Sequence, residues 1–217
     1  MGITATDIKL LEKALSINPD IETVIEAGAQ NLYLNGEQFP PFANTWYEQN
    51  GIEYNCIDLS GDNGALKYDL AYPLPIKLQY DLVTNFGTGE HVVQMEGYET
   101  VSFHEGHIHS IYPKGVSSVE LGFYNFCRNI HNLCKIGGII INVNPLTGHW
   151  PLHGYTWLTM EFYTELAKLT RYEIKELYIE AGMGNYETGM NVCCMVIKMA
   201  DTFPDFETFK KLSYKKN

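Results

Sequence analysis

The sequence has few basic residues. It has 217 residues, with 15 Lys and Arg against 26 Asp and Glu, which gives a formal net charge of −11 at pH 7. Proteins that bind a nucleic-acid backbone carry a basic surface. Here the basic residues gather only in a short tail that contains Lys210, Lys211, Lys215 and Lys216. We therefore expect no nucleic-acid partner, and a substrate that is a small molecule.

The sequence also lacks the marks of membrane and secreted proteins. No stretch approaches the roughly 18 consecutive apolar residues of a membrane span. The N-terminus lacks the basic start and apolar segment of a secretory signal. No C-x-x-C pair is present among the five cysteines, which suggests buried free thiols in a reducing compartment. We expect a cytoplasmic protein with no membrane partner.

The composition is that of a globular protein with a sizeable core, since 45% of the residues are hydrophobic and 19% are charged. Apolar spacing and turn residues predict alternating helices and strands. Helices are expected over residues 4–16, 43–49, 117–134 and 159–169, and strands over 22–27, 54–58, 65–70, 81–85, 139–143, 172–179 and 191–199. This alternation predicts a single α/β domain over residues 1–217, with a doubly wound, mostly parallel sheet and helices on both faces.

The sequence also predicts two helix ends and one irregular segment. Thr6 is a candidate cap for the first helix. Gly137 and Gly138 are expected to end the third. Residues 95–116 show no clear period, and we interpret them as an inserted loop or lid beside the site.

Polar and glycine residues follow several of the predicted strands. Because parallel strands end at one edge of a sheet, and ligands of open α/β sheets bind there, these residues are expected to converge on one crevice. The residues concerned are Glu26, Gly28, Asp58, Asp69, Asn85 and Gly87. A purely structural alternative is that Asp58 and Asp69 cap turns.

The order of these motifs resembles the class I S-adenosylmethionine-dependent methyltransferase family. Glu26-Ala27-Gly28 resembles the first motif of that family, and the segment 80–91, which starts Tyr-Asp-Leu-Val and ends Glu-His, resembles its strand-four motif. The residues 137–140, Gly-Gly-Ile-Ile, resemble the lead-in to strand five. The resemblance implies a seven-stranded sheet whose last strand is antiparallel and inserted near the edge. It also implies methyl transfer to a small-molecule acceptor.

The resemblance further implies a binding site for S-adenosylmethionine. Asp58 would accept two hydrogen bonds from the ribose. Asp69 would accept one from the adenine amine, the backbone N–H of Leu70 would donate to the ring, and Glu26 would orient the turn or meet the ammonium group. The full set of implied cofactor-binding residues is Glu26, Gly28, Asp58, Leu59, Asp69, Leu70, Asn85, Phe86 and Gly87.

The first motif departs from the family in one respect. The family usually has further glycines here, whereas Gly28 is followed by Ala29, Gln30 and Asn31. A side chain in this turn lies where backbone should approach the ligand closely. An alternative function is therefore a methyltransferase-like binding or assembly module without catalytic activity.

Histidines supply the remaining chemistry. An imidazole near neutral pH can act as the base that some methyl acceptors need. The candidates are His91, His149 and His153, which follow the fourth and fifth core strands; the structural alternative, which the sequence favours for each one taken singly, is a loop or helix-start histidine. A third hypothesis is a metal-dependent hydrolase built on the loop from His104 to His109. We expect no metal there, because a full ligand set is missing.

Overall fold

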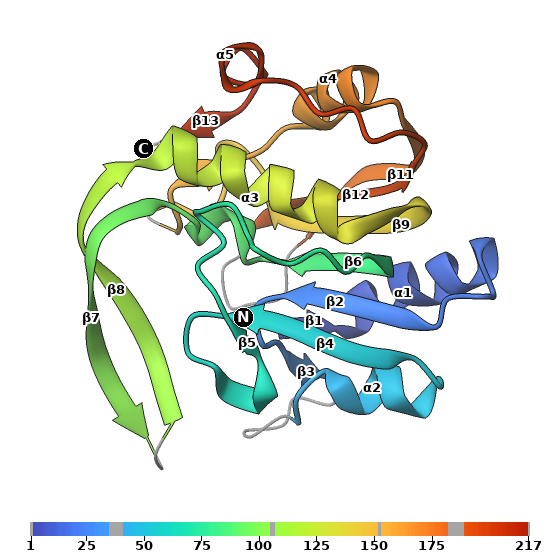
Figure 1. Ribbon diagram of the computed structural model, residues 1–217, viewed down its shortest axis with the longest axis horizontal. Helices are drawn as coiled ribbons and strands as arrows, with labels where there is room; N and C mark the ends of the chain where they lie inside the picture. Colours follow the sequence, from blue (N-terminus) through green and yellow to red (C-terminus); the bar gives the residue numbers. More distant parts are fainter. Residues whose placement is uncertain (1, 35–40, 105–106, 152, 182–188, 217) are drawn as a thin grey trace.

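In the computed structural model, seven strands form one mixed sheet (Figure 1). The structure describes residues 2–34, 41–104, 107–151, 153–181 and 189–216. From one edge to the other, the strands are β5 (Leu66–Lys67), β4 (Glu53–Asp58), β2 (Thr23–Ala27), β6 (Tyr80–Phe86), β9 (Cys134–Pro145), β12 (Met190–Lys198) and β11 (Tyr172–Ala181).

The direction of the strands makes the sheet mixed. The neighbours from β5 to β9 pair in parallel, whereas β12 runs antiparallel to both β9 and β11. The final strand of the sheet along the chain is thus inserted between the fifth and sixth. The sequence predicted this arrangement through the resemblance, and the methyltransferase-like α/β architecture is confirmed.

Helices cover both faces of the sheet and make two cores (Figure 1). On one face, α1 (Ala5–Ile17) and α2 (Asn44–Gln49) contribute Leu11 and Tyr47 to the core. On the other face, α3 (Val119–Leu133), α4 (Met160–Thr170) and α5 (Phe206–Phe209) contribute aromatic side chains. Phe123, Phe162 and Phe209 are among the largest fully buried side chains. Burial on both faces explains why the central strands read as continuous apolar runs.

The expected cap of the first helix was wrong by two residues. Thr4, not Thr6, is the N-cap of α1, and it forms a capping box with Asp7. The Thr4 hydroxyl accepts from the Asp7 N–H, while the Asp7 carboxylate accepts from the Thr4 N–H at 2.8 Å. This reciprocal pair satisfies two backbone donors that a helix start leaves free.

The end of α3 also differs from the prediction. The helix ends at Leu133, and Gly137 and Gly138 lie within β9. Lys198 of β12 is fully buried, and its Nζ donates to the carbonyls of His131 and Cys134, each at 2.9 Å. A lysine from a distant strand therefore satisfies carbonyls at the helix end, where a cation is favourable.

The segment expected to be an irregular loop is a β-hairpin. It consists of β7 (Gln94–His104) and β8 (His107–Ser118), which pair antiparallel and project from the body (Figure 1). Bulges interrupt the register in several places, which explains why the sequence shows no clean alternation. Residues 105–106 of the candidate hydrolase loop lie outside the described residues, as do 182–188 of the loop between β11 and β12.

Shorter elements complete the chain. The small strands β1 (Gly2–Thr4) and β3 (Asn31–Tyr33) pair in parallel, and β10 (Thr156–Trp157) pairs with β13 (Lys215–Lys216). Two 3₁₀ turns, η1 (Asp62–Gly64) and η2 (Gly89–His91), follow β4 and β6. All five cysteines have free thiols. Across the described ranges, no helix is both long and apolar enough to cross a membrane.

Candidate functional site

Three parallel strands end together at the edge where the site was expected. Ala27 of β2 pairs with Ile57 of β4 on one side and with Asn85 of β6 on the other. The Gly28 N–H then donates to the Ile57 carbonyl at 2.8 Å. The residues that follow these strands, Gly28, Asp58 and Gly87, consequently share one edge of the sheet.

Asp58 holds the turn that follows β2. One carboxylate oxygen accepts from the Ala29 N–H at 3.0 Å, and the other accepts from the Ser60 N–H at 2.8 Å. The side chain of Asp58 remains partly exposed, as does its neighbour Leu59. Each carboxylate oxygen accepts about two hydrogen bonds. Asp58 therefore caps turns and still has capacity to bind a ligand.

Asp69 and Leu70 belong to a loop that α3 fixes in place. The Asp69 carboxylate accepts from the Ala71 N–H at 2.8 Å, and Asn129 of α3 donates to the Leu70 carbonyl at 3.0 Å. Leu70 is buried, whereas Asp69 is partly exposed. The loop is thus positioned by buried amides of a helix, and it presents a carboxylate to solvent.

Glu26 lies inside the protein, beneath the edge. Its carboxylate is fully buried and accepts from the Tyr54 hydroxyl at 2.8 Å and from the Tyr47 hydroxyl at 3.4 Å. It also accepts from the Gln30 N–H at 3.4 Å, so it orients the turn that begins at Gly28. Burial raises the pKa of Glu26 to about 7, although these hydrogen bonds oppose the rise.

The space in front of Gly28 is filled by two side chains. A Cβ on Gly28 would come within 2.5 Å of the Thr88 hydroxyl and 2.6 Å of Gln30 Nε2. Gln30 Nε2 donates to Thr88 Oγ1 at 2.8 Å and to the Ala27 carbonyl at 3.3 Å. Gln30 is 3% exposed. Gln30, at a position where the family motif usually has a further glycine, therefore packs against the turn at Gly28.

A chain of buried amides starts at the end of β6. Asn85 Oδ1 accepts from the N–H groups of Thr88 and Gly89, both at 3.0 Å, and shapes the turn η2. Asn85 Nδ2 donates to Asn144 Oδ1 at 3.0 Å. Asn144 Nδ2 in turn donates to Glu90 Oε2 at 3.0 Å. These bonds connect the ends of β6 and β9 and fix one oxygen of Glu90.

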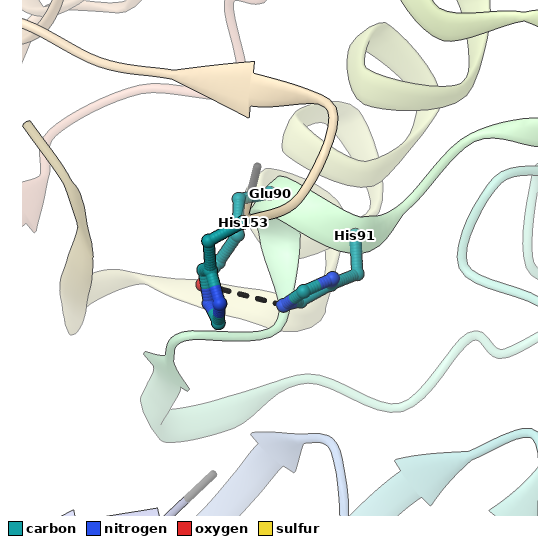
Figure 2. Close-up of side chains that lie close together, drawn as sticks. All are labelled: Glu90, His91 and His153. Atoms are coloured by element: carbon teal, nitrogen blue, oxygen red, sulfur yellow. Dashed lines mark ion pairs between the residues drawn. The ribbon is translucent and has the colours of Figure 1, made fainter. Parts of the chain in front are cut away.

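Two of the three candidate histidines meet at Glu90 (Figure 2). His91 Nε2 lies 3.8 Å and His153 Nε2 lies 3.6 Å from Glu90 Oε1. The two rings approach edge-on, with centroids 4.8 Å apart. Glu90 is 1% exposed. Burial lowers the pKa of His91, although the Glu90 carboxylate opposes this change.

This cluster opens on a cavity of about 190 Å³. Its walls come from the ends of β6, β9 and β11 and from the starts of β12 and α1. They include Thr4, Asp7, Phe86, Gly87, Glu90, Asn144, Trp150 and His153. The third candidate histidine, His149, does not line this cavity. Gly28, Asp58 and Asp69 do not line this cavity, but Gly87 does, and the next residue, Thr88, donates to the Ala27 carbonyl beside Gly28 at 2.8 Å.

Sequence reasoning missed two residues of this site, Glu90 and Asn144. A signal for Glu90 was present, because an acidic residue directly before His91 at a predicted strand end is a candidate metal or catalytic group. The burial of Asn144 depends on packing between β6, β9 and α4, and one sequence does not reveal it.

The comparisons with known proteins support the fold. No protein-family description and no curated protein matches the chain. Among solved structures, a Burkholderia thailandensis 1,6-didemethyltoxoflavin-N1-methyltransferase with bound S-adenosylhomocysteine is 11% identical, with a TM-score of 0.55 over 87% of this chain and 76% of that one. A Brevibacillus brevis polyketide-synthase O-methyltransferase, also in complex with S-adenosylhomocysteine, is 8% identical, with a TM-score of 0.52 over 94% and 75%.

A putative methyltransferase from Bacillus halodurans is 10% identical, with a TM-score of 0.50 over 89% of this chain and 98% of that one. At these identities the comparison concerns the fold. The chain therefore has the fold of the class I S-adenosylmethionine-dependent methyltransferases.

Proposed function

We propose that this protein transfers a methyl group from S-adenosylmethionine to a small-molecule acceptor. The observation that carries the proposal is the adjacency of two features. The strand edge with Gly28 and Asp58 also carries Gly87, and Gly87 lines a cavity together with Glu90 and His153. A cofactor on the edge would have its sulfur directed toward an acceptor in the cavity.

The nucleoside half of the cofactor fits the chain. Asp58 would bind the ribose hydroxyls with the hydrogen-bonding capacity that its two backbone partners leave. Asp69 and the backbone of Leu70 would contact the adenine, and Leu59 would lie beside them. Phe86 and Gly87 would border the sulfur, since both line the cavity.

The amino-acid half of the cofactor meets an obstacle in Gln30. This side chain must leave the space in front of Gly28, which breaks its hydrogen bonds to Thr88 and to the Ala27 carbonyl. Each such bond contributes about 0.5–1.5 kcal/mol. The binding energy of a ligand can meet this cost, so Gln30 acts as a gate on the cofactor site.

The chemistry needs little beyond placement. S-adenosylmethionine supplies a methyl group on a positively charged sulfur, and the carbon–sulfur bond breaks with both electrons on sulfur. The protein has to hold the acceptor in line with that bond, which is worth several kcal/mol. The walls of the cavity would hold the acceptor. If the acceptor is a hydroxyl or a carboxylic acid, its reacting oxygen must lose a proton. Glu90, His91 or His153 would accept that proton.

A second candidate is a binding module that lacks turnover. The placement of Gln30 favours it, because a permanently closed gate would exclude the cofactor. The two candidates differ in whether the purified protein both binds an adenosyl compound and transfers its methyl group. The module would bind no adenosyl compound, or would bind one and transfer no methyl group to any acceptor.

A crystal structure with S-adenosylhomocysteine tests the proposal. We expect adenosine against Asp58 and Asp69, Gln30 turned away from Gly28, and the sulfur facing Glu90 and His153. Transfer of labelled methyl from S-adenosylmethionine to a panel of hydroxylated and acidic small molecules would then identify the acceptor class. Adenosine bound at any other surface would overturn the assignment.

A further inference from the structure

We propose that Glu90, His91 and His153 form a binding site for one divalent transition-metal ion, such as Zn²⁺. The three side chains come from two separate segments, the turn η2 and the loop after β9 (Figure 2). One ligand atom from each lies within 4.8 Å of the other two. Whether the site binds metal is independent of the proposed methyl transfer.

The spacing of the atoms suits a shared ion better than direct contact. Both imidazole Nε2 atoms face the same oxygen, Glu90 Oε1, at 3.6 Å and 3.8 Å. These separations are too long for good hydrogen bonds. Two ligand atoms that each lie about 2.1 Å from a tetrahedral Zn²⁺ are separated by about 3.4 Å. The observed distances exceed that value by only a few tenths of an ångström.

One group in the cluster lacks a hydrogen-bond partner, and a second is a buried carboxylate without a close cation. His91 Nε2 is buried and has no hydrogen-bond partner. Glu90 is buried, and among the described residues its carboxylate has ion pairs only with His91 and His153. Buried charges are normally paired or coordinate metals. A cation between the three side chains would satisfy both groups.

The residues around Glu90 fix the orientation of its side chain, as metal coordination requires. Asn144 binds Oε2 and leaves Oε1 to face the histidines. The Tyr155 N–H donates to the Glu90 carbonyl at 2.7 Å. Gly154 packs so closely that a Cβ there would lie 2.9 Å from Glu90 Cγ. Such supporting contacts are typical of metal ligands, whose orientation depends on hydrogen bonds to their other atoms.

The ligand set defines the class of ion. Two imidazoles and one carboxylate suit Zn²⁺, Fe²⁺ and Co²⁺, whereas Mg²⁺ and Ca²⁺ prefer oxygen ligands. Three protein ligands leave a further position open, as in catalytic zinc sites. Glu90 and His153 line the cavity, so the open position would face it.

The ion would also deepen the proposed function. A hydroxyl or acid of the acceptor at the open position would lose its proton to water more easily, because the cation stabilises the negative oxygen. That oxygen would then be the nucleophile. This role depends on methyl transfer, but metal binding does not.

The test is a metal titration of protein stripped with a chelator. We expect one Zn²⁺ or Co²⁺ per chain by calorimetry and elemental analysis, with a Co²⁺ absorption spectrum that reports nitrogen and oxygen ligands. Mg²⁺ should not compete. His153→Asn changes a partly exposed ligand and should weaken Zn²⁺ affinity by at least about 100-fold. His91→Asn should do the same.

A matched control removes the hairpin histidines instead. The variant His104→Asn, His107→Asn and His109→Asn should bind the ion as the wild type does, and circular dichroism should show every variant folded. Absence of stoichiometric Zn²⁺ or Co²⁺ binding in the wild type would overturn the proposal. So would binding that survives His153→Asn but disappears in the hairpin variant. Metal binding without S-adenosylhomocysteine binding would support this site and contradict only the proposed function.

Discussion

Gln30 and Thr88 meet across the turn that follows β2, where the amide of Gln30 donates to the Thr88 hydroxyl at 2.8 Å. The two side chains come from segments 58 residues apart, and together they cover Gly28. In a turn with further glycines this space would be open to a ligand. If the proposed cofactor binds at this turn, it has to break this contact first.

Gln30→Ala should tighten binding of S-adenosylhomocysteine. The substitution removes the side chain that the ligand has to displace. Ligand binding then no longer has to break the two hydrogen bonds of Gln30. At about 0.5–1.5 kcal/mol each, the gain corresponds to roughly tenfold in affinity. Calorimetry measures it, and Gln49→Ala at the exposed end of α2 is the matched control. Unchanged or weaker binding in Gln30→Ala would show that Gln30 is not a gate.

Glu26 should make the protein less stable as the pH rises. Its ordinary pKa is 4.5, and burial raises it to about 7 in the folded state. Between these values the folded state retains a proton that the unfolded state has lost. The free energy of unfolding should therefore fall from about pH 4.5 to about pH 7 and change no further above that range, a loss of at most about 3 kcal/mol.

Glu26→Gln isolates this effect. Glutamine cannot ionise, and it can still accept from Tyr54, which is the shortest of the hydrogen bonds to Glu26. The variant should be more stable than the wild type at pH 8, and the difference should shrink toward pH 4.5. Urea denaturation across this range measures it, with the exposed Glu53→Gln as control. A difference between variant and wild type that does not depend on pH would contradict the assignment.

Asn85→Ala should destabilise the fold strongly. The buried amide makes bonds to Thr88, Gly89 and Asn144, and its loss leaves buried donors and acceptors without partners. We expect a loss of about 2–4 kcal/mol in the free energy of unfolding. Urea denaturation measures the loss, and Asn132→Ala at an exposed position is the control. A loss comparable with that of the control would show that these bonds are dispensable.

The sequence predicted the architecture because most of its elements have local signals. Continuous apolar runs marked the central strands, and spacings of three and four marked α1, α3 and α4. The strands of the hairpin β7–β8 were missed because repeated bulges break their alternation. The glycines expected to end α3 were the wrong terminator, since Lys198, 64 residues beyond Cys134, donates to carbonyls at the end of the helix. That contact exists only in the folded chain.

The site could be predicted only where its residues lie at the ends of predicted strands. Residues at strand ends, such as Gly28 and Asp58, follow from topology alone. The meeting of His91 with His153 does not, because it depends on how the loop after β9 folds back onto η2. Gln30 was identified as a departure from the family motif, but only packing shows that its side chain turns inward.

Calorimetry with S-adenosylhomocysteine measures whether the carboxylates at the strand edge bind a nucleoside. The wild type should bind one molecule per chain. Asp58→Asn keeps the size of the side chain but loses its charge, and it should weaken binding by roughly tenfold or more, because hydrogen bonds to a charged group are worth about 1.5–3 kcal/mol. The control Asp20→Asn, at an exposed turn, should bind as the wild type does. Equal affinity in Asp58→Asn and wild type, or no binding by either the wild type or Gln30→Ala, would contradict the account.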